Sequence, residues 1–341
     1  MGGYQRDSDK ENLLREVFRA LKDGRMALVE GFGKGVPKEL IDEINDESRA
    51  LSNRLGRRVG SVGSYQKIEA IKGEGLESIK PAGLRQAFDI HHREVISLVG
   101  GGGKTTLMFA LAREIASSGE LVVTTTTTKI LEPSSSETPL LLLQAHEKNI
   151  VKALLQNVDK HRHITLAREK LSSGKLAGVS PELIIELAEL NLASHIVVEA
   201  DGAAHRSLKA PNPTEPVIPS NTSLVIPVVG ADAIGCYLTE GNVFRPEIVS
   251  RLLGLPLGAV VSAEAIAFLV AHPRGIIKGS PTQARIIPFI NKVDLEEGLM
   301  KGRDLASKIL AMNHPQIGRV VLGHAQLPEA VVEVIQRRIK R

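Results

Sequence analysis

A run of four glycines constrains the fold of this chain more than any other sequence feature. An apolar segment over 95–99 leads directly into Gly100–Gly103, and the segment after Lys104 has apolar residues at helical spacing. Glycine lets a backbone turn tightly around an anion, and the start of a helix offers that anion N–H groups and a positive dipole. The order strand, glycines, helix therefore predicts a phosphate-binding loop. Its residues are Gly100, Gly101, Gly102, Gly103, Lys104, Thr105 and Thr106.

Lys104 and Thr105 have separate predicted roles in this loop. Lys104 would supply positive charge to the β- and γ-phosphates of a nucleotide, and the Thr105 hydroxyl would bind Mg²⁺. The longer pattern G-x-x-x-x-G-K-[ST] needs glycine at position 98, where this chain has Leu98, so the match is to the shorter G-x-x-G-K-T-T. A glycine-rich turn with an incidental lysine is the alternative. The ordered strand, loop and helix favour nucleotide binding.

From residue 94 onward, short apolar runs alternate with segments of helical spacing. This order predicts an α/β fold with a doubly wound, mainly parallel sheet of the P-loop nucleoside triphosphatase type. We predict a P-loop domain over 94–341, ending in a helix from about Pro328. Residues 1–93 carry no chemistry-bearing motif and form an N-terminal extension, α/β or helical, of unknown role.

Composition argues against several classes of function. Aromatic residues make up 3% of the chain and Trp is absent, so stacking platforms for nucleic acid are not expected. A single cysteine, Cys236, cannot start a Cys-x-x-Cys metal site. The charged N-terminus lacks the apolar segment of a signal peptide, and no apolar run is long enough to span a membrane. We therefore expect a soluble cytoplasmic protein without nucleic-acid or membrane partners.

Two carboxylates follow the apolar run at 196–198, and hydroxyls follow an earlier strand. Asp201 is the expected Mg²⁺ ligand, usually through water, and Glu199 would orient or activate the attacking water. A solvated strand end is the alternative. The run of threonines at 124–128 precedes Lys129, and one or two of its hydroxyls are expected near the γ-phosphate or Mg²⁺. Thr126 and Lys129 are the candidates for this contact.

The segment Asn291-Lys292-Val293-Asp294 matches the N-K-x-D loop that selects guanine in many GTPases. An aspartate at the fourth position accepts hydrogen bonds from guanine N1–H and from its 2-amino group, which adenine lacks. The stem of Lys292 can lie on the base. The alternative is a strand-to-helix turn with a polar cap. The residues 323–325 follow the next strand, where GTPases often place an N–H that reaches guanine O6.

An ordered set of motifs resembles one known family. VGGGGKTTL, VVTTTTTKI, VVEADGA, LKAPNPTEPVIP, VVGADAIG, VFRPE and FINKVD occur in that order over roughly two thirds of the chain. They are similar to YqeC-type proteins, regarded as selenium cofactor biosynthesis proteins that serve selenium-dependent molybdenum hydroxylases. The resemblance implies a P-loop fold, a maturation role and a place in the site for Lys209, Glu215 and Arg245, where they could contact phosphate, substrate or one another.

The leading hypothesis is Mg²⁺-dependent binding and hydrolysis of GTP or ATP, with GTP favoured by the N-K-x-D loop. Hydrolysis would change the contacts of the 124–137 loop and of the segment after Asp201. The partner would be an apo-hydroxylase, its cofactor or another maturation protein. Two alternatives remain: an ATP-dependent amide ligase like the Mur ligases, which share the short loop, and a nucleotide-gated scaffold that does not hydrolyse.

Overall fold

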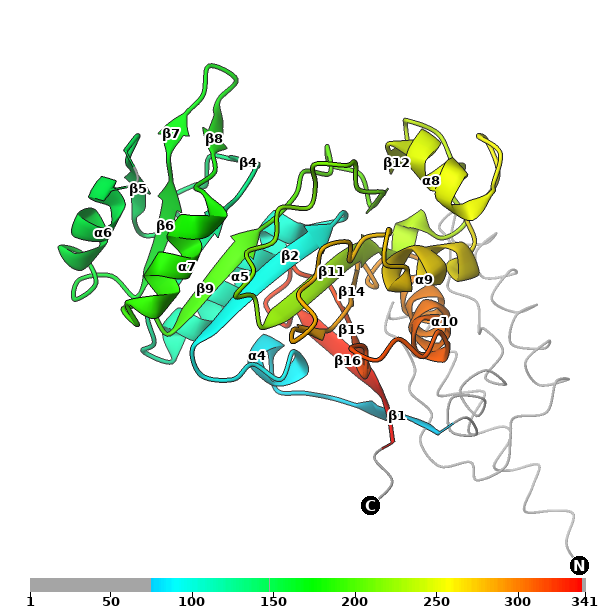
Figure 1. Ribbon diagram of the computed structural model, residues 1–341. Helices are drawn as coiled ribbons and strands as arrows, with labels where there is room; N and C mark the ends of the chain where they lie inside the picture. The colour runs from blue at the N-terminus through cyan, green and yellow to red at the C-terminus, as the bar shows by residue number, and fades with distance from the viewer. Residues whose placement is uncertain (1–74, 147, 339–341) are drawn as a thin grey trace, which may run out of the picture. The chain divides into compact units, whose positions relative to one another are not determined.

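Strands with apolar residues on both faces form the centre of a mixed sheet (Figure 1). The computed structural model describes residues 75–146 and 148–338. Eleven strands join one sheet in the order β1-β16-β15-β14-β11-β2-β9-β3-β6-β5, and β13 pairs with β11. The pairings of β16 with β1 and with β15 are antiparallel, and the other pairings in this sheet are parallel. Burial on both faces is typical of parallel strands covered by helices, so the predicted α/β class is confirmed.

The main-sheet strands have the following bounds. They are β1 Leu76–Ile79, β2 Glu94–Gly100, β3 Val122–Thr126, β5 Leu141–Leu143, β6 His163–Ala167, β9 His195–Glu199, β11 Leu224–Gly230, β13 Arg285–Ile286, β14 Phe289–Asn291, β15 Arg319–Gly323 and β16 Val331–Arg337. Two small sheets consist of β4 Lys129–Leu131, β7 Glu169–Lys170 and β8 Lys175–Ala177, and of β10 Leu208–Lys209 and β12 Val243–Phe244.

Helices cover both faces of the sheet, as a doubly wound fold requires. Helix α5 packs its Leu107 and Leu111 in a core with Ile96 of β2, whereas α7 packs Ile184 in a second core with Val95. Because Val95 and Ile96 are neighbours on a strand, they point to opposite faces. The helices are α4 Leu84–Ala87, α5 Lys104–Ser117, α6 Lys148–Leu155, α7 Pro181–Glu189, α8 Pro246–Leu253, α9 Ala263–Ala271 and α10 Gly298–Ala311, with a 3₁₀ turn, η1, at Ala231–Ala233.

Local start signals agree with the observed helices. The Ser180 hydroxyl accepts a hydrogen bond from the Leu183 N–H, and Pro181 occupies the first turn of α7. A serine cap followed by proline is a favoured helix start. Among the described residues, no helix combines the length and apolarity needed to cross a membrane.

The segment after Pro328 differs from the prediction. A helix was expected there, but Val331–Arg337 is strand β16, which lies between β15 and β1. Its β-branched residues favour a pleated strand, and the pairing with residues 76–79 cannot be recognised from local spacing.

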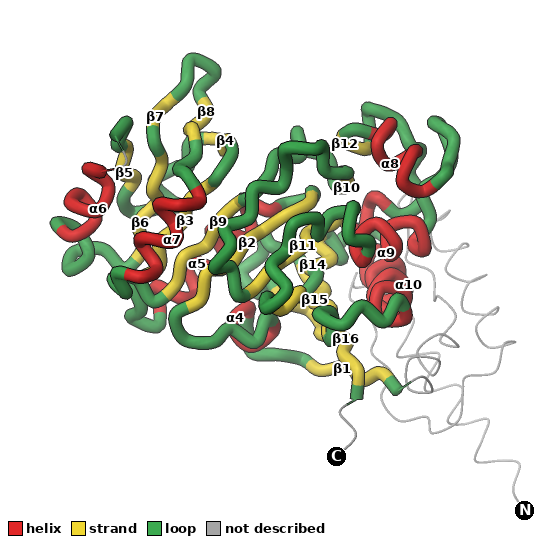
Figure 2. Tube along the Cα trace, viewed as in Figure 1, coloured by secondary structure: helices red, strands yellow, loops and turns green. Residues whose placement is uncertain are grey.

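The compact unit that holds the phosphate loop begins at Leu76. Strand β1 and helix α4 therefore belong to it, although they precede the expected start at residue 94. Most of the expected extension over 1–93, namely residues 1–74, lies outside the described residues. The carboxyl ends of β2, β9, β3, β11, β14 and β15 meet at one edge of the sheet, where loops gather (Figure 2).

Candidate nucleotide-binding site

The glycine loop connects β2 to α5 through positions that other residues would strain. Gly102 has a φ of 81°, and a Cβ there would lie 2.6 Å from the Gly230 N atom. A Cβ on Gly101 would lie 2.5 Å from the Arg206 carbonyl oxygen. Glycine at these two positions is therefore required by close packing against β11 and the loop after β9.

Three N–H groups of the loop are directed into the protein. The N–H of Gly100 donates to the Asp201 carboxylate (3.1 Å), that of Gly101 to the Val228 carbonyl (2.8 Å) and that of Gly102 to the Arg206 carbonyl (2.8 Å). Within the described part of the chain, the N–H groups of 103–106 have no acceptor. The start of α5 is thus the part of the loop that can offer N–H groups and its dipole to an anion.

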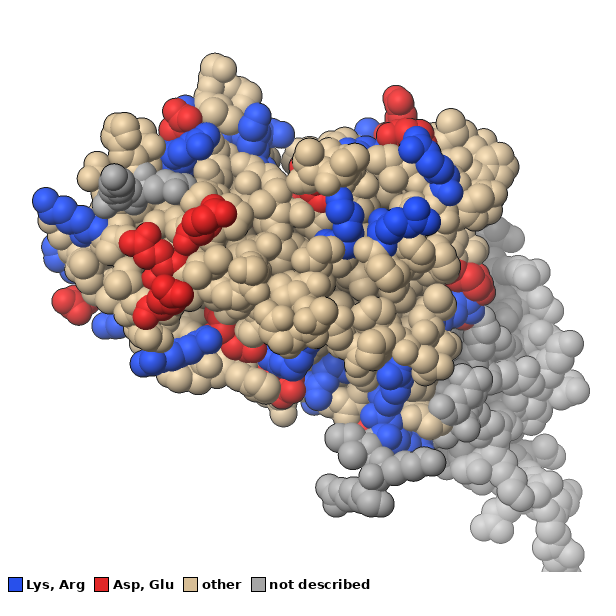
Figure 3. Space-filling model, viewed as in Figure 1, with Lys and Arg blue, Asp and Glu red and all other residues tan. Residues whose placement is uncertain are grey.

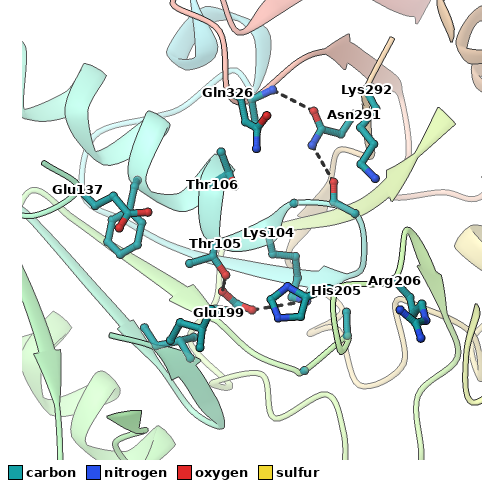
Figure 4. A pocket seen from close by; sticks show the side chains of 18 of the residues that line it. Lys104, Thr105, Thr106, Glu137, Glu199, His205, Arg206, Asn291, Lys292 and Gln326 are labelled. Atoms are coloured by element: carbon teal, nitrogen blue, oxygen red, sulfur yellow. Dashed lines mark hydrogen bonds and ion pairs between the residues drawn. The ribbon is translucent and has the colours of Figure 1, made fainter. Parts of the chain in front are cut away.

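Lys104, Thr105 and Glu199 lie together at the start of α5 (Figure 4). Thr105 Oγ1 donates to Glu199 Oε2 at 2.6 Å, and Lys104 Nζ lies 3.5 Å from Glu199 Oε1. Burial lowers the pKa of Lys104, but the neighbouring Asp201 and Glu199 carboxylates outweigh it, so the pKa is raised. Burial raises the pKa of Glu199, and Lys104 opposes that shift. A hydroxyl and a carboxylate oxygen in contact are a donor set that suits Mg²⁺.

Asp201 lies behind the phosphate loop, with 1% of its surface exposed. Its carboxylate accepts the Gly100 N–H and contacts Lys104 Nζ (3.2 Å) and Lys209 Nζ (2.8 Å). It does not line the cavity in front of the loop, whereas Glu199 does. The two carboxylates therefore have different surroundings: Thr105 faces Glu199, whereas Asp201 accepts the Gly100 N–H and contacts two lysines. The metal role of Asp201 stays a prediction.

Lys209, Glu215 and Arg245 also lie outside the cavity wall. Lys209 Nζ lies 3.4 Å from Glu215 Oε2, and Arg245 Nη1 donates to the same oxygen at 2.8 Å. These three side chains form an ion-pair chain behind the phosphate loop. The expected pairing of Glu215 with Lys209 and Arg245 is therefore observed, whereas a contact of these residues with phosphate or substrate stays a prediction.

The threonine run bonds to the protein itself. Thr126 Oγ1 donates to the Glu199 carbonyl at 2.7 Å, and Thr127 Oγ1 donates to the Val217 carbonyl at 2.7 Å. No residue of 124–128 lines the cavity, and the Thr126 hydroxyl is bonded to the protein. A contact of Thr126 with phosphate stays a prediction. Lys129, at the start of β4, does line it.

A cavity of about 660 Å³ extends in front of the phosphate loop. Its walls come from the loop and α5, from β4 and β8, from 202–206, and from the ends of β14 and β15. Within the described unit, the surface is notched between the β7–β8 and β12–α8 segments, and basic side chains lie on both sides (Figure 3). This volume is typical of small-molecule sites.

Asn291 joins three parts of this cavity. Its Nδ2 donates to the Gly102 carbonyl (2.7 Å), and its Oδ1 accepts the Ala325 N–H (2.9 Å). The Ala325 N–H is therefore occupied, and the next N–H, that of Gln326, has no acceptor among the described residues. Figure 4 shows Asn291 between the loop and the segment with Gln326.

Lys292 and Asp294 line the same side of the cavity. Lys292 Nζ donates to Ser207 Oγ (2.7 Å) and pairs with Asp232 (2.8 Å), so its stem lies along the wall. Asp294 is exposed, and no described side chain pairs with it. Exposed Leu295 adds apolar surface here. An unpaired carboxylate beside a lysine stem and a leucine can hold a planar polar ring.

His205 and Arg206 line the cavity but were not among the candidates from the sequence. Ala204 and His205 have φ values of 46° and 61°, which L-residues adopt at a cost. Figure 4 shows His205 in front of Glu199 and Lys104. The sequence signal that could have identified them is their position, as two basic residues soon after Glu199 and Asp201.

A phosphate loop at the carboxyl edge of a doubly wound parallel sheet is characteristic of the P-loop class, and this chain has the α/β fold of that class. Residues 96–247 match the model of the YqeC protein family. The chain is 35% identical over 123 residues to "Uncharacterized protein YqeC" of Escherichia coli (strain K12). The match covers 36% of this chain and 48% of that protein, so it spans about half the length of the curated relative. The resemblance is confirmed for this stretch; the N-K-x-D loop lies beyond it.

Two solved structures are similar at low identity. The signal recognition particle receptor FtsY from Elizabethkingia anophelis has a TM-score of 0.34 and 13% identity, covering 95% of this chain and 90% of that chain. The 54 kDa signal recognition particle protein from Aeropyrum pernix K1, in complex with GDP, has a TM-score of 0.35 and 15% identity, covering 94% and 65%.

Proposed function

We propose that this chain binds a Mg²⁺–nucleoside triphosphate, preferably GTP, and hydrolyses it. The observation that carries the proposal is one cavity that joins the start of α5 to the Asn291–Asp294 loop. The N–H groups of 103–106 would hold phosphates, while Asp294 and the Lys292 stem would hold the base. Guanine offers two donors to the Asp294 carboxylate, and its O6 would accept the free N–H of Gln326.

Around the phosphates, each side chain has a distinct proposed part. Lys104 would turn from the carboxylates to the β- and γ-phosphates, and Thr105 with Glu199 would hold Mg²⁺, directly or through water. The metal would neutralise charge on the phosphates. His205 and Arg206 would lie beside the γ-phosphate. Because the Arg206 carbonyl accepts the Gly102 N–H, their loop is coupled to the phosphate loop and could respond to the nucleotide.

The proposed cellular role is that of an accessory factor in maturing a selenium-dependent molybdenum hydroxylase. The YqeC resemblance supports it. The partner would be the apo-hydroxylase, its cofactor or another maturation protein in the cytoplasm. Among the described residues, no cluster of three or more His, Cys, Asp or Glu side chains could hold a metal ion, so a role through nucleotide-driven contacts is favoured over carriage of a metal cargo.

A second candidate is transfer of the γ-phosphate to a carboxylate substrate, as in an amide ligase. Lys129 pairs with Ala177 and Leu131 with Lys175 in the β4–β8 register, so both lysines lie on one face of that sheet. Both line the cavity, and neither has a carboxylate partner among the described residues. Two such cations suit an anionic acceptor. Release of phosphate only when a carboxylate and an amine are added would favour this candidate.

Calorimetric titration with Mg²⁺ complexes of non-hydrolysable GTP and ATP analogues tests the base preference. Wild type should bind GTP more tightly, and Asp294→Asn should lose that preference because an amide cannot accept both guanine donors. Lys104→Ala should weaken both nucleotides. Asp159→Asn, the same change at an exposed position away from the cavity, is the control. Equal binding of both nucleotides with an indifferent Asp294 would remove the GTP proposal, and absence of binding would remove nucleotide binding altogether.

A Mg²⁺ titration at fixed nucleotide separates the two carboxylates. Glu199→Gln should raise the Mg²⁺ concentration needed for tight triphosphate binding. Asp201→Asn should leave that requirement closer to wild type and instead lower stability, because it weakens the anchor at Gly100. The reverse result would return the metal to Asp201. Binding without catalysed release of phosphate in wild type would favour the scaffold alternative.

A further inference from the structure

We propose that Lys209 is a positioning residue that frees Lys104 to bind phosphate, by acting as the permanent counter-ion of Asp201. This inference rests on the proposed nucleotide site. P-loop chemistry requires a lysine at the start of α5, but it does not require a second buried lysine behind the loop. Both lysines converge on one carboxylate here, which is the feature that needs an explanation.

The ion-pair chain of Lys209, Glu215 and Arg245 continues toward the phosphate loop through Asp201 to Lys104 and Glu199. Lys104 Nζ lies 3.2 Å from Asp201 Oδ1 and 3.5 Å from Glu199 Oε1. Lys209 Nζ lies 2.8 Å from Asp201 Oδ2. Asp201 and Lys209 are each 1% exposed and do not line the cavity, so water is not available to replace a cation that Asp201 loses. A buried carboxylate that loses its cation is strongly disfavoured.

The two lysines differ in how firmly they are held. Lys104 has the proposed task of turning toward the phosphates, and its remaining bond is to the Gly100 carbonyl (2.7 Å). Lys209 donates to the Gly202 carbonyl (2.6 Å), and Glu215 holds it from the far side. Lys209 lies in strand β10, which pairs with β12. It therefore stays with Asp201 when Lys104 leaves.

The outer part of the chain is fixed to the fold as well. Arg245 pairs with Glu215 (2.8 Å) and lies 4.5 Å from the centre of the Phe244 ring. Lys278 Nζ donates to the carbonyls of Asn212, Pro213 and Glu215 at 2.7–2.9 Å. These contacts hold Glu215 in place, so Lys209 is not drawn along when Lys104 moves.

The consequence concerns triphosphate binding. With Lys209 present, Asp201 keeps one cation and the Gly100 N–H after Lys104 turns away. Without Lys209, Lys104 is the only described side-chain cation that contacts Asp201, and its departure leaves that carboxylate buried and unpaired. Lys104 then stays with Asp201 and does not contact the phosphates, so the triphosphate binds more weakly. A neutral side chain at 201 removes this conflict.

The experiment measures dissociation constants for the Mg²⁺ complex of a non-hydrolysable GTP analogue on the full chain. Lys209→Met, which keeps length without charge, should weaken binding by at least about tenfold. Asp201→Asn combined with Lys209→Met should recover binding to within about threefold of wild type. In a Lys104→Ala background, Lys209→Met should change affinity less than about twofold, because no lysine remains to be retained. Lys160→Met, at an exposed position, is the matched control.

The outcomes separate this inference from the nucleotide site itself. Failure of wild type to bind either nucleotide rejects the proposed function. Tight binding by wild type and equally tight binding by Lys209→Met rejects only the positioning role. A loss of the same size with and without Lys104 also rejects it, since that result describes a structural lysine. If Lys209→Met does not fold, the double variant Asp201→Asn with Lys209→Met decides. Nucleotide affinity of the double variant equal to that of Asp201→Asn alone supports the positioning role. Much weaker nucleotide binding by a folded double variant overturns it.

Discussion

Replacing Asn291 with alanine removes a side chain that ties the phosphate loop to the segment after β15. The amide of Asn291 is 5% exposed and makes two bonds to backbone groups, donating to the Gly102 carbonyl and accepting the Ala325 N–H. Both backbone groups belong to residues that line the cavity. The change therefore leaves one carbonyl and one N–H without their partners while altering little apolar packing.

The expected loss follows from those two groups. A buried backbone group left without a partner costs about 1–3 kcal/mol. Water in the adjacent cavity can partly solvate each of the two groups. We therefore expect Asn291→Ala to lower the free energy of unfolding by about 2–4 kcal/mol. Asn291→Asp retains an acceptor for the Ala325 N–H, but it directs a carboxylate oxygen at the Gly102 carbonyl. Asn291→Ala should therefore weaken both contacts, whereas Asn291→Asp should weaken only the contact with Gly102.

Urea unfolding and amide hydrogen exchange together test this reasoning. Asn291→Ala should lower the unfolding midpoint and speed exchange at Ala325, while Asn291→Asp should leave the Ala325 amide protected. Asn242→Ala, an exposed asparagine with one bond to the Tyr237 carbonyl, should stay within about 0.5 kcal/mol of wild type. Wild-type stability and unchanged Ala325 exchange in Asn291→Ala would refute the bridging role.

Two stability predictions rest on other parts of the fold. His163 is buried in β6, and its pKa is lowered from 6.5 to about 4, first by burial and then by Arg113. The unfolded chain binds the proton more readily than the folded chain does. The contribution of neutral, buried His163 to the free energy of unfolding is therefore complete above pH 6.5, and about 3 kcal/mol of it is lost as the pH falls toward 4. His163→Asn should reduce the difference in urea stability between pH 7 and pH 4.5, and an unchanged difference would contradict this reasoning. A Cβ on Gly178 would overlap the Thr126 carbonyl oxygen, so Gly178→Ala should cost about 1–3 kcal/mol, whereas Gly202→Ala, which meets nothing within 4 Å, should be close to neutral in the same assay.

The architecture was predictable because local patterns and one general rule were sufficient. Buried apolar runs indicated parallel strands, and apolar residues at helical spacing after Lys104 indicated α5. In such sheets the carboxyl ends of the strands share an edge. The glycine loop, the carboxylates after β9 and the Asn291 loop were therefore expected at one edge of the sheet, and the structure places them there.

The different surroundings of Glu199 and Asp201 were not predictable from their spacing. Both follow the apolar run at 196–198, and from the sequence either could face a metal. Asp201 lies past the end of β9, where its carboxylate caps the Gly100 N–H and meets Lys209. That position depends on β10, which is brought behind the loop by its pairing with β12. Contacts between segments this far apart leave no local pattern, and for the same reason β16 was taken for a helix.

The glycines themselves illustrate why a correct pattern can have more than one physical cause. The sequence explains Gly101 and Gly102 by the need of the backbone to surround an anion. In the structure their N–H groups bond to Val228 and Arg206, and a side chain at either position would collide with backbone. Close packing alone would therefore require glycine at both positions. Under the proposed function, either the N–H groups of 103–106 hold the phosphates, or the triphosphate also releases the Gly102 N–H from Arg206. Exchange rates of these amides with and without nucleotide would distinguish the two.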